Sequence, residues 1–323
     1  MFKNSTILEI INDLIGFENV FSGQSILLLK NNSLHGNEVS FKTGSIDAQP
    51  LSFLQSKLNN NLTPPSILNN TIIQKIDSNK FGLLGDYFTG NLIRTGITFT
   101  GMKDEFLEIK DVKKKRALLE GKKSVKSQYC KPKITNYINY DKGLLKRLND
   151  NYADALDQGK NKKQLWIGLG DSLVFQSPKL IVLQTGNKII ATYSEEDLCL
   201  NLSLFSISNI NEKGQKSEID LKLILGQLNS KLMTYFAIKE NYIQRRSGSV
   251  PQIRLKQLKL LPIIIPQEDE IKQLVTIVEK ILANNINEEN NTSLLQSEID
   301  KIMYKLYDLS DEEIKEVEGF TPE

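Results

Sequence analysis

Short apolar runs separated by polar turns dominate the chain before residue 210 and indicate strands. Residues 6–14 and 24–30 are two such runs, and they predict a strand hairpin. At 81–109, glycines punctuate short β-branched and aromatic runs, which is typical of a β-meander with tight turns. Four later runs also have strand character and are bounded by Gly, Pro or Asp: 165–175, 178–184, 187–193 and 200–208.

The segment between these runs is less regular. Residues 110–130 are basic, and we expect them to be helical or mobile. Residues 131–138 have the pattern of a strand, and 142–164 show a weak helical period. A mixed β-rich region with one helical insertion follows from these patterns.

Helical spacing replaces the strand pattern from residue 218 onward. Residues 218–242 repeat apolar positions at helical intervals. Residues 267–284 and 293–308 each carry one apolar stripe and are joined by a short polar turn, which predicts an antiparallel helix pair. Ser310 precedes three acidic residues and is expected to cap a last short helix.

Residues 244–266 combine features of both parts. Strand-like runs at 250–254 and 261–265 enclose a short basic amphipathic helix, and arginines precede the Gly/Ser turn before them. The predicted fold class is therefore α+β: a mixed β-rich domain followed by helices that include an antiparallel pair, with a strand hairpin in front.

Composition restricts the class of protein. The chain has 323 residues, of which 40% are apolar and 25% charged, as in ordinary globular proteins. No apolar run reaches the roughly 18–20 residues that a membrane-spanning helix needs, and we recognise no export signal. Cys130 and Cys199 form no metal or disulfide pattern. We expect a cytoplasmic protein that does not contact a membrane.

Charge is distributed unevenly although the net charge is only +2. Residues 110–133 are rich in lysine, and residues 239–259 carry six Lys/Arg against Glu240. From Glu288 to the end, acids outnumber bases. This pattern indicates that one face meets a polyanion; a solvated lysine-rich surface is the alternative for 110–133.

Motifs for catalysis or cofactor binding are not recognisable. His35 is the only histidine and has no partners at catalytic or zinc-site spacing. GLGD at 168–171 precedes another strand-like run where a phosphate-binding loop needs a helix. TPPS at 63–66 lacks the Asn/Asp/Ser and the aromatic residue that flank the two prolines of amino-methyltransferases.

Four stretches, taken together, carry a family resemblance. They are residues 17–31 (FENVF…SILLLKN), 84–101 (LGDYFTGNLIRTGITFTG), 225–266 (LGQLNSKLMTYF…PQIRLKQLKLLPIIIP) and 298–319 (EIDKIMYKLYDLSDEEIKEVEG). In this order they resemble the carboxy-terminal target-recognition domain of Taq-type adenine-N6 DNA methyltransferases. That domain also occurs in single-chain restriction–modification enzymes and is related to Type I specificity subunits.

The resemblance implies an organisation in three parts. Residues 1–35 would be the remnant of a methyltransferase domain, its final strand hairpin; 36–266 the target-recognition domain; and 267–323 a helical region. The S-adenosylmethionine site of the family precedes the hairpin, so no cofactor is expected in this chain. The expected partners are double-stranded DNA and a methyltransferase subunit or missing N-terminal catalytic domain. The chain would then be a separate subunit, a split gene product or a truncation.

Base-reading and phosphate-binding residues are expected on turns and strand ends. Arginine and glutamine read base edges, and lysine neutralises phosphates; for each candidate a surface ion pair or a solvated side chain is the alternative. Asn229 is expected to cap or fasten a neighbouring loop, and Trp166 to lie in the core, with stacking on an extruded base as the alternative for Trp166. The predicted DNA-contacting residues are Arg94, Thr95, Lys113, Lys114, Lys115, Arg116, Arg245, Arg246, Ser247, Gln252, Arg254 and Lys256.

Three functions remain open at this point. The first is sequence-specific DNA recognition without catalysis, directing a methyltransferase and, in some systems, a nuclease module to its site. The second is a complete or residual adenine-specific DNA methyltransferase or endonuclease. The third is a protein-interaction module that regulates a restriction system.

Overall fold

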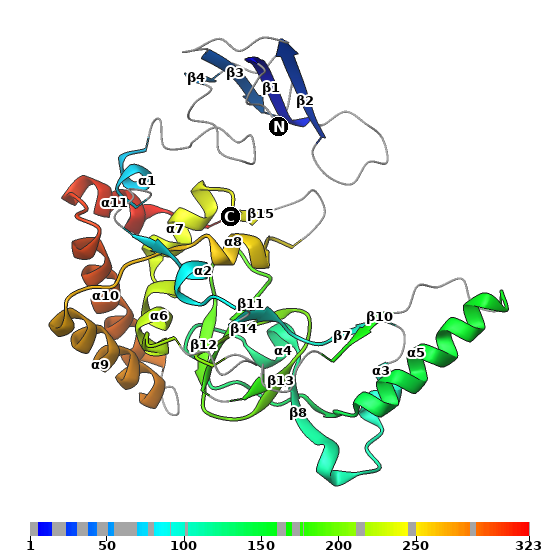
Figure 1. The fold of residues 1–323 in the computed structure, drawn as a ribbon. Helices are drawn as coiled ribbons and strands as arrows, with labels where there is room; N and C mark the ends of the chain where they lie inside the picture. The colour runs from blue at the N-terminus through cyan, green and yellow to red at the C-terminus, as the bar shows by residue number, and fades with distance from the viewer. Residues whose placement is uncertain are drawn as a thin grey trace. The chain divides into compact units, whose positions relative to one another are not determined.

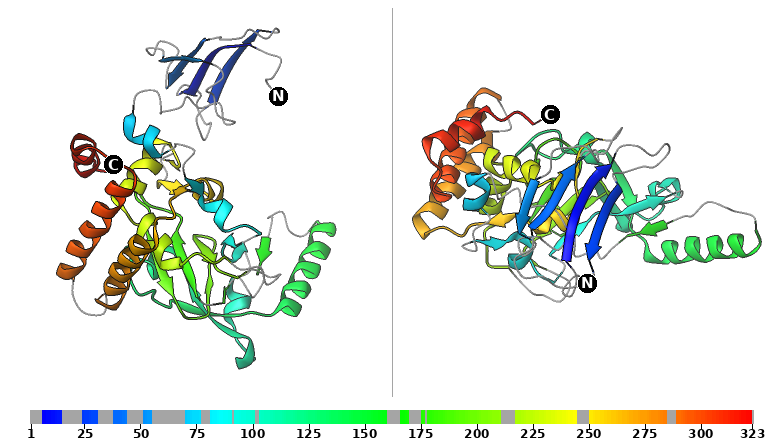
Figure 2. Two further views of the ribbon diagram at one scale, coloured as in Figure 1. Left: turned by 60° about the vertical axis from the view of Figure 1, so that its left-hand side comes forward. Right: turned by 90° about the horizontal axis from the view of Figure 1, so that it is seen from above.

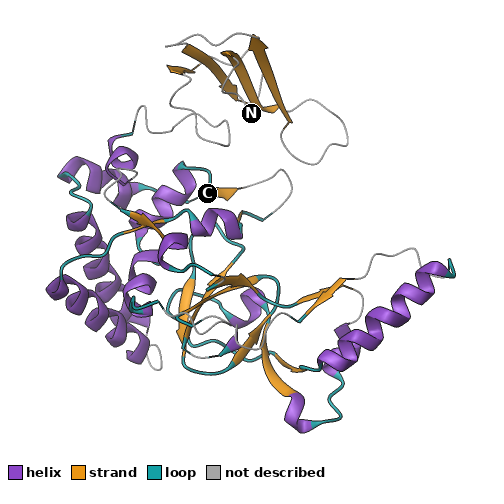
Figure 3. Cartoon of the chain, viewed as in Figure 1, coloured by secondary structure: helices purple, strands orange, loops and turns teal. Residues whose placement is uncertain are grey.

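The computed structural model describes most of the chain, and its secondary structure is α+β, as predicted (Figure 3). Small sheets, short helices and one long helix make up the described part of the chain to residue 210, and mostly helices follow. The residues described are 6–14, 24–30, 38–43, 51–54, 70–76, 81–90, 92–100, 103–159, 166–169, 175–176, 178–210, 217–244, 250–284 and 289–322.

The chain divides into two compact units. Unit 1 comprises Met1–Ser78 with Gln244–Pro251, and unit 2 comprises Asn79–Ile243 with Gln252–Glu323. Each unit is described by itself below. The assignment of residues 1–35 to a methyltransferase remnant stays a prediction.

Unit 1 contains a four-stranded sheet in the order β2–β1–β3–β4. The predicted hairpin is present, because β1 pairs antiparallel with β2, while β3 pairs parallel with β1 and antiparallel with β4. Buried apolar residues explain the interior position of β1, since Ile7, Ile10 and Ile11 are each 4% exposed or less. The elements are β1 (Thr6–Leu14), β2 (Gln24–Lys30), β3 (Glu38–Thr43), β4 (Leu51–Leu54) and the helix α1 (Thr71–Ile76).

Two sheets form the β part of unit 2. One is antiparallel, in the order β12–β11–β14–β6, and the other has the order β13–β8–β9. One hydrophobic cluster draws residues from both, among them Ile181, Leu204 and Leu118. The strands are β6 (Ile93–Thr95), β11 (Lys179–Leu183), β12 (Ala191–Ser194), β14 (Leu204–Ser208), β8 (Lys115–Leu119), β9 (Asn136–Asn139) and β13 (Leu198–Leu200).

Two pairs of short strands and one long helix accompany these sheets. β5 (Gly82–Leu83) pairs with β17 (Pro262–Ile263), and β7 (Thr98–Thr100) pairs with β10 (Trp166–Gly168). The helix α5 (Lys142–Asp157) confirms the weak helical period at 142–164 and extends outward from the sheets (Figure 1). Four of its apolar residues pack against the core cluster: Leu144, Leu145, Leu148 and Tyr152.

The expectation of a continuous meander at 81–109 is wrong in part. Two short helices, α2 (Leu84–Tyr87) and α3 (Lys103–Leu107), interrupt the strands. The Asp86 carboxylate accepts a hydrogen bond from the backbone N–H of Leu83 at 3.0 Å, and this local bond closes a helical turn where the sequence pattern favours a strand.

The expectation of a helical or mobile segment at 110–130 is also wrong in part, because a strand separates two short helical turns. The segment forms a 3-10 turn, η3 (Val112–Lys114), then β8 and a short helix, α4 (Gly121–Ser124). Leu118 and Leu119 are fully buried, and β8 pairs with both β9 and β13. Burial in a sheet therefore overrides the helical preference of the lysines that surround these leucines.

Helices from the C-terminal part of the chain gather at one end of unit 2 (Figure 1). The predicted helix at 218–242 is two helices, because the Ser230 hydroxyl caps the second one by accepting from the N–H of Met233 at 3.1 Å. α9 and α10 pack against each other, as the predicted helix pair requires (Figure 2). The helices are α6 (Leu221–Leu228), α7 (Lys231–Lys239), α9 (Glu268–Asn284), α10 (Glu289–Leu306) and α11 (Asp311–Gly319).

Two sequence features explain details of this helical region. A Cβ on Gly226 would come within 2.5 Å of the Leu274 side chain, so the glycine lets α6 and α9 approach closely. Ser310 and Glu313 form the capping box at the start of α11, which confirms the predicted cap. Among the described helices, none has the length and apolar character that crossing a bilayer requires.

Candidate nucleic-acid interface

Five of the predicted DNA-contacting residues lie on neighbouring elements of unit 2. β16 (Gln252–Ile253) leads into α8 (Leu255–Lys259), and α8 contacts β6. Buried Ile253 and Leu258 fix this segment in the core, which leaves the residues between them near the surface. We call the five the β6–α8 group: Arg94 and Gln252, which are half-buried, and Thr95, Arg254 and Lys256, which are exposed.

The alternation expected around Ile253 is present. Ile253 is 2% exposed, whereas Gln252 is half-buried and Arg254 is exposed. Arg254 has an extended backbone and occupies the N-cap position of α8. Its side chain therefore extends from the junction of a strand and a helix, where the backbone is held on both sides.

Gly96 allows the backbone that carries Arg94 and Thr95 to pack closely against residues 200–204. The N–H of Gly96 donates to the carbonyl of Leu204 at 3.0 Å, and the next residue, Ile97, donates to Leu200 at 2.6 Å. A Cβ on Gly96 would lie 2.2 Å from the Leu200 carbonyl oxygen and 2.3 Å from that of Asn201. Only glycine allows this approach of two backbones directly after Thr95.

Two amide side chains from the end of α6 hold the surrounding strands. Gln227 is fully buried; its Nε2 donates to the carbonyl of Ile264 at 2.9 Å, and its Oε1 accepts from the N–H of Ile264 at 3.1 Å. The backbone N–H and C=O of Ile264, directly after β17, are therefore both paired, as they would be beside a neighbouring strand. Gln227 belongs to the sequence pattern LGQLNSKL, but the pattern alone does not predict that Gln227 binds Ile264.

Asn229 makes the equivalent pair of bonds with β12. Its Oδ1 accepts from the N–H of Ala191 at 2.9 Å, and its Nδ2 donates to the Ala191 carbonyl at 3.0 Å. Gln128 donates in turn to the carbonyl of Asn229 at 2.8 Å. The fastening role predicted for Asn229 is confirmed, but the segment it fastens is the edge strand β12 and not a loop.

The remaining described candidates, Lys113 to Arg116, occupy η3 and the start of β8. Figure 1 places β8 at the opposite end of unit 2 from α8, so these residues form a separate η3–β8 group. Arg245, Arg246 and Ser247 lie outside the described residues, as does His35. The side chain of Trp166 is likewise not described.

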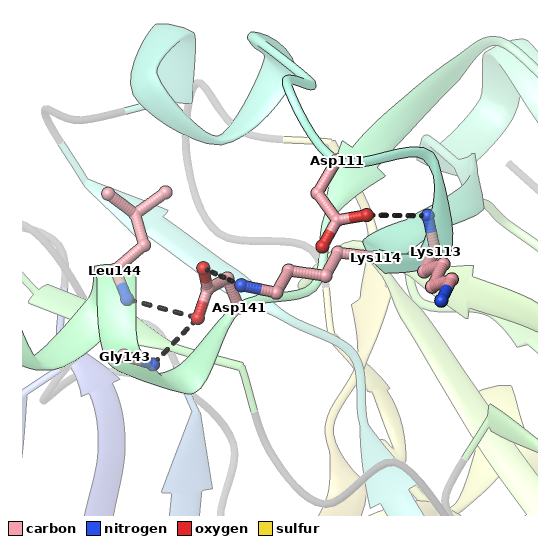
Figure 4. Close-up of polar contacts among 6 residues, drawn as sticks. All are labelled: Asp111, Lys113, Lys114, Asp141, Gly143 and Leu144. Atoms are coloured by element: carbon pink, nitrogen blue, oxygen red, sulfur yellow. Dashed lines mark hydrogen bonds and ion pairs between the residues drawn. The ribbon is translucent and has the colours of Figure 1, made fainter.

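Three cations of the η3–β8 group have partners within the chain. Lys114 Nζ lies 2.7 Å from Asp141 Oδ2 (Figure 4). Lys115 Nζ lies 3.9 Å above the centre of the Tyr137 ring. Arg116 Nη1 donates to the backbone carbonyl of Lys115 at 3.2 Å. The DNA contacts predicted for these residues stay predictions.

Asp141 connects this group to α5. Besides Lys114, its carboxylate accepts from the N–H groups of Gly143 at 2.8 Å and Leu144 at 3.2 Å, which makes Asp141 the N-cap of α5 (Figure 4). The hydrogen bond from Lys114, followed by those from the backbone, holds the pKa of Asp141 below its ordinary value. The turn before β8 and the start of α5 are thus held by one carboxylate.

Lys179 is a buried cation that the sequence did not single out. Its Nζ donates to the carbonyls of Phe175 at 2.6 Å, Gln176 at 3.3 Å and Glu196 at 2.9 Å. Burial lowers the pKa of Lys179 to about 8. Its three carbonyl acceptors indicate a structural role, and within the described residues no group of His, Cys, Asp and Glu could hold a metal ion.

A family model matches the middle of the chain. Residues 107–263 match the family described as the TaqI-like C-terminal specificity domain. A protein of Methanocaldococcus jannaschii named as a type II restriction enzyme and methyltransferase is 26% identical over 164 residues, which are 49% of this chain and 13% of that protein. The chain therefore spans a small part of this relative's length.

Two solved structures are similar to the chain at a low level. The Type IIL restriction–modification enzyme MmeI, solved in complex with DNA, has a TM-score of 0.49 at 12% identity, with 98% of this chain and 46% of the MmeI chain covered. A type I restriction–modification system has a TM-score of 0.29 at 8% identity, with 73% of this chain and 50% of that chain covered.

Proposed function

We propose that this chain, whose residues 107–263 form a TaqI-like C-terminal specificity domain, recognises a specific sequence in double-stranded DNA. The family match carries this proposal. The chain acts as the recognition portion of a restriction–modification adenine-N6 methyltransferase, without catalysing the reaction itself.

The geometry of the β6–α8 group supports the proposal. Arg254 and Gln252 are side chains of the types that read base edges, and both extend from backbone fixed by buried Ile253. Gln184 fixes the strand further, because its carbonyl accepts from the N–H of Ile253 at 3.0 Å. Rigid presentation of a few polar side chains lowers the entropic cost of binding and favours discrimination between sequences.

The cationic side chains of the group supply the second requirement of DNA binding. Lys256 on α8 and Arg94 on β6 lie on elements that contact each other. Lysine and arginine neutralise phosphates and position the protein on the duplex, while base contacts select the sequence. We assign Gln252 and Arg254 to base reading and Lys256 to phosphate binding.

Catalysis is assigned to a partner. S-adenosylmethionine would be bound by a methyltransferase module outside this chain, which this chain directs to its site.

Selection from a random library tests recognition and, in the same experiment, identifies the target sequence. The purified chain is mixed with duplexes that contain a central randomised region, and bound duplexes are recovered, amplified and sequenced over several rounds. We expect one short motif to become enriched. Recovery of duplexes with no enriched motif, or no binding to duplex DNA, would contradict the proposal.

A further inference from the structure

A further basic surface lies on the segment Gly121–Lys133, apart from the twelve residues predicted from sequence. Five lysines of this segment are exposed: Lys122, Lys123, Lys126, Lys131 and Lys133. We call them the α4 lysine surface. Among the residues that the structure describes, none of the five makes an ion pair.

Buried residues between the lysines fix the segment in place. Ser124, Val125 and Tyr129 are each 1% exposed or less. Gly121 has φ +49°, which favours glycine, and Tyr129 has φ 58°, which is uncommon for a side chain of its size. The backbone therefore follows one defined path, with anchors directed inward and lysines outward.

One hydrogen bond closes the segment on itself, because the N–H of Lys133 donates to the Ser124 carbonyl at 2.9 Å. Others attach it to two other parts of unit 2, and among them the N–H of Tyr129 donates to Ala191 at 3.0 Å. The Gln128 side chain donates to the carbonyls of Ile189 and Asn229, both at 2.8 Å. A lysine surface held in this way loses less backbone entropy on binding an anion than a mobile lysine tail does.

The local sequence contains little negative charge that could neutralise the surface. Between Asp111 and Asp141, Glu120 is the only acid against nine Lys/Arg. The Glu120 carboxylate accepts from the Thr135 hydroxyl at 3.1 Å. Such an excess of positive charge creates a local potential that attracts a polyanion.

A chain of hydrogen bonds connects this surface to the β6–α8 group. The N–H of Gly121 donates to Asn201 Oδ1 at 3.1 Å, in the turn that also contains Ser203. The Ser203 carbonyl accepts from the N–H of Gln184 at 3.0 Å, and the Gln184 carbonyl accepts from Ile253 at 3.0 Å. Hydrogen bonds thus connect the start of the α4 lysine surface, through the turn 201–203 and Gln184, to Ile253 of β16.

We propose that the α4 lysine surface binds phosphates of double-stranded DNA outside the bases that the β6–α8 group recognises. This inference rests on the proposed function, because it assumes that the chain binds a duplex. The lysines add affinity that does not depend on sequence, and they extend the contacted length of the duplex.

The salt dependence of binding to a non-target duplex tests this inference. Fluorescence anisotropy is measured with a labelled 30-base-pair duplex of arbitrary sequence, chosen by the experimenter, over a series of KCl concentrations. The variant changes all five lysines to glutamine (K122Q, K123Q, K126Q, K131Q, K133Q) in the full chain. Each phosphate contact contributes about 0.9 to the slope of log affinity against log salt, so we expect the slope to become shallower by roughly 2 to 4.

The C-terminal helices offer a control of equal charge. Lys272, Lys280, Lys301, Lys305 and Lys315 are also five exposed lysines, and changing them to glutamine lowers the net charge equally. We expect this control to keep the wild-type slope within about 1. Circular dichroism melting curves of both variants establish that they fold.

Three outcomes separate the two proposals. A folded five-lysine variant with the wild-type slope overturns the inference and leaves the proposed function standing. An equal change of slope in the control also overturns it, because net charge would then explain the effect. Failure of the wild-type chain to bind any duplex contradicts both proposals.

Discussion

The α4 lysine surface and the C-terminal helices each present five lysines to solvent, but their electrostatic surroundings differ. Residues 267–323 contain fifteen Asp/Glu and five Lys, whereas residues 112–140 contain nine Lys/Arg and one Glu. In the helices, Lys272 pairs with Glu268 at 2.7 Å and Lys305 with Glu270 at 3.4 Å. The number of lysines therefore does not identify a polyanion-binding surface; the density of acids around them does.

The acids of the helical region also serve internal packing. Glu318 of α11 forms an ion pair with Lys231 of α7 and accepts from the Tyr304 hydroxyl of α10 at 2.8 Å. The Tyr235 hydroxyl donates to Glu316. Charge in this region joins helices to one another, whereas charge on the α4 lysine surface is directed toward solvent.

The largest expected effect on stability comes from disrupting the close backbone approach at Gly96, next to the β6–α8 group. Gly96→Ala places a Cβ within 2.3 Å of two backbone carbonyl oxygens, and should lower the free energy of unfolding by about 3 kcal/mol or more. Chemical denaturation measures this loss.

Gly319 in α11 provides the matched control for Gly96. A Cβ there meets nothing within 4 Å, so Gly319→Ala should be neutral or slightly stabilising. Equal effects of the two substitutions would contradict the close backbone approach at Gly96.

The two amide side chains of α6 give the next largest effect, because they join the helices to the β part. Gln227→Leu and Asn229→Leu each leave a buried backbone N–H and C=O without these partners. Each should cost about 2 kcal/mol in urea unfolding. Gln273 is exposed on α9, and Gln273→Leu should change stability by less than about 0.5 kcal/mol.

A buried carboxylate in the helical region predicts a pH effect. Asp300 is 4% exposed, and burial raises the pKa of Asp300 to about 6 in the folded protein, compared with about 3.9 in an unfolded chain. The stabilising contribution of its protonated form is therefore complete below about pH 3.9 and is lost as pH rises through the folded pKa.

Asp300→Asn isolates this effect. Asparagine can still accept the hydrogen bond that Lys231 N–H now donates at 2.8 Å, but it carries no charge. At pH 8 the variant should be more stable than the wild type by about 1–2 kcal/mol, and at pH 4 the two should be equal. Glu298→Gln, at an exposed position of the same helix, is the control. A wild-type-like pH profile in Asp300→Asn would contradict this account.

The smallest effect is expected at the start of α5. Asp141→Ala removes the N-cap and the partner of Lys114, at a cost of about 1 kcal/mol. Because the folded pKa of Asp141 lies below its ordinary value, the contribution of this carboxylate is present above about pH 4 and is lost as pH falls through the folded pKa.

Hydrogen exchange of the first-turn amides of α5 checks this prediction. Asp150→Ala, which removes the exposed pair between Asp150 and Lys146, should leave those amides protected. Equal loss of protection in both variants would show that Asp141 is not the cap.

Elements governed by local pattern could be predicted from sequence. The apolar stripe of α9, the Ser310 cap and the strands β1 and β2 follow from periodicity and capping chemistry alone, and all are present. Around residues 84–87 and 115–119 the prediction failed, because a local Asp86 bond and burial of Leu118 outweigh the pattern.

For the β6–α8 group, the sequence predicted the residue types expected to contact DNA but not which distant residues hold the surrounding strands in place. Gln252 and Arg254 were identified from a strand next to a basic helix, but nothing local indicates that Gln227 binds Ile264 or that Asn229 binds Ala191. The partners of Lys114 and Lys179 likewise depend on segments distant in sequence or on backbone carbonyls. Long-range pairing decides which cations are structural and which are free to meet a ligand.

The most direct measurement compares the affinity of the chain for its selected duplex with that for a scrambled duplex of equal length, at one salt concentration. We expect the wild type to prefer the selected duplex by about a thousandfold or more. Arg254→Ala should reduce this ratio at least about tenfold, while the five-lysine variant of the α4 surface should weaken both affinities and keep the ratio. Equal affinity of the wild type for the two duplexes would contradict sequence-specific recognition.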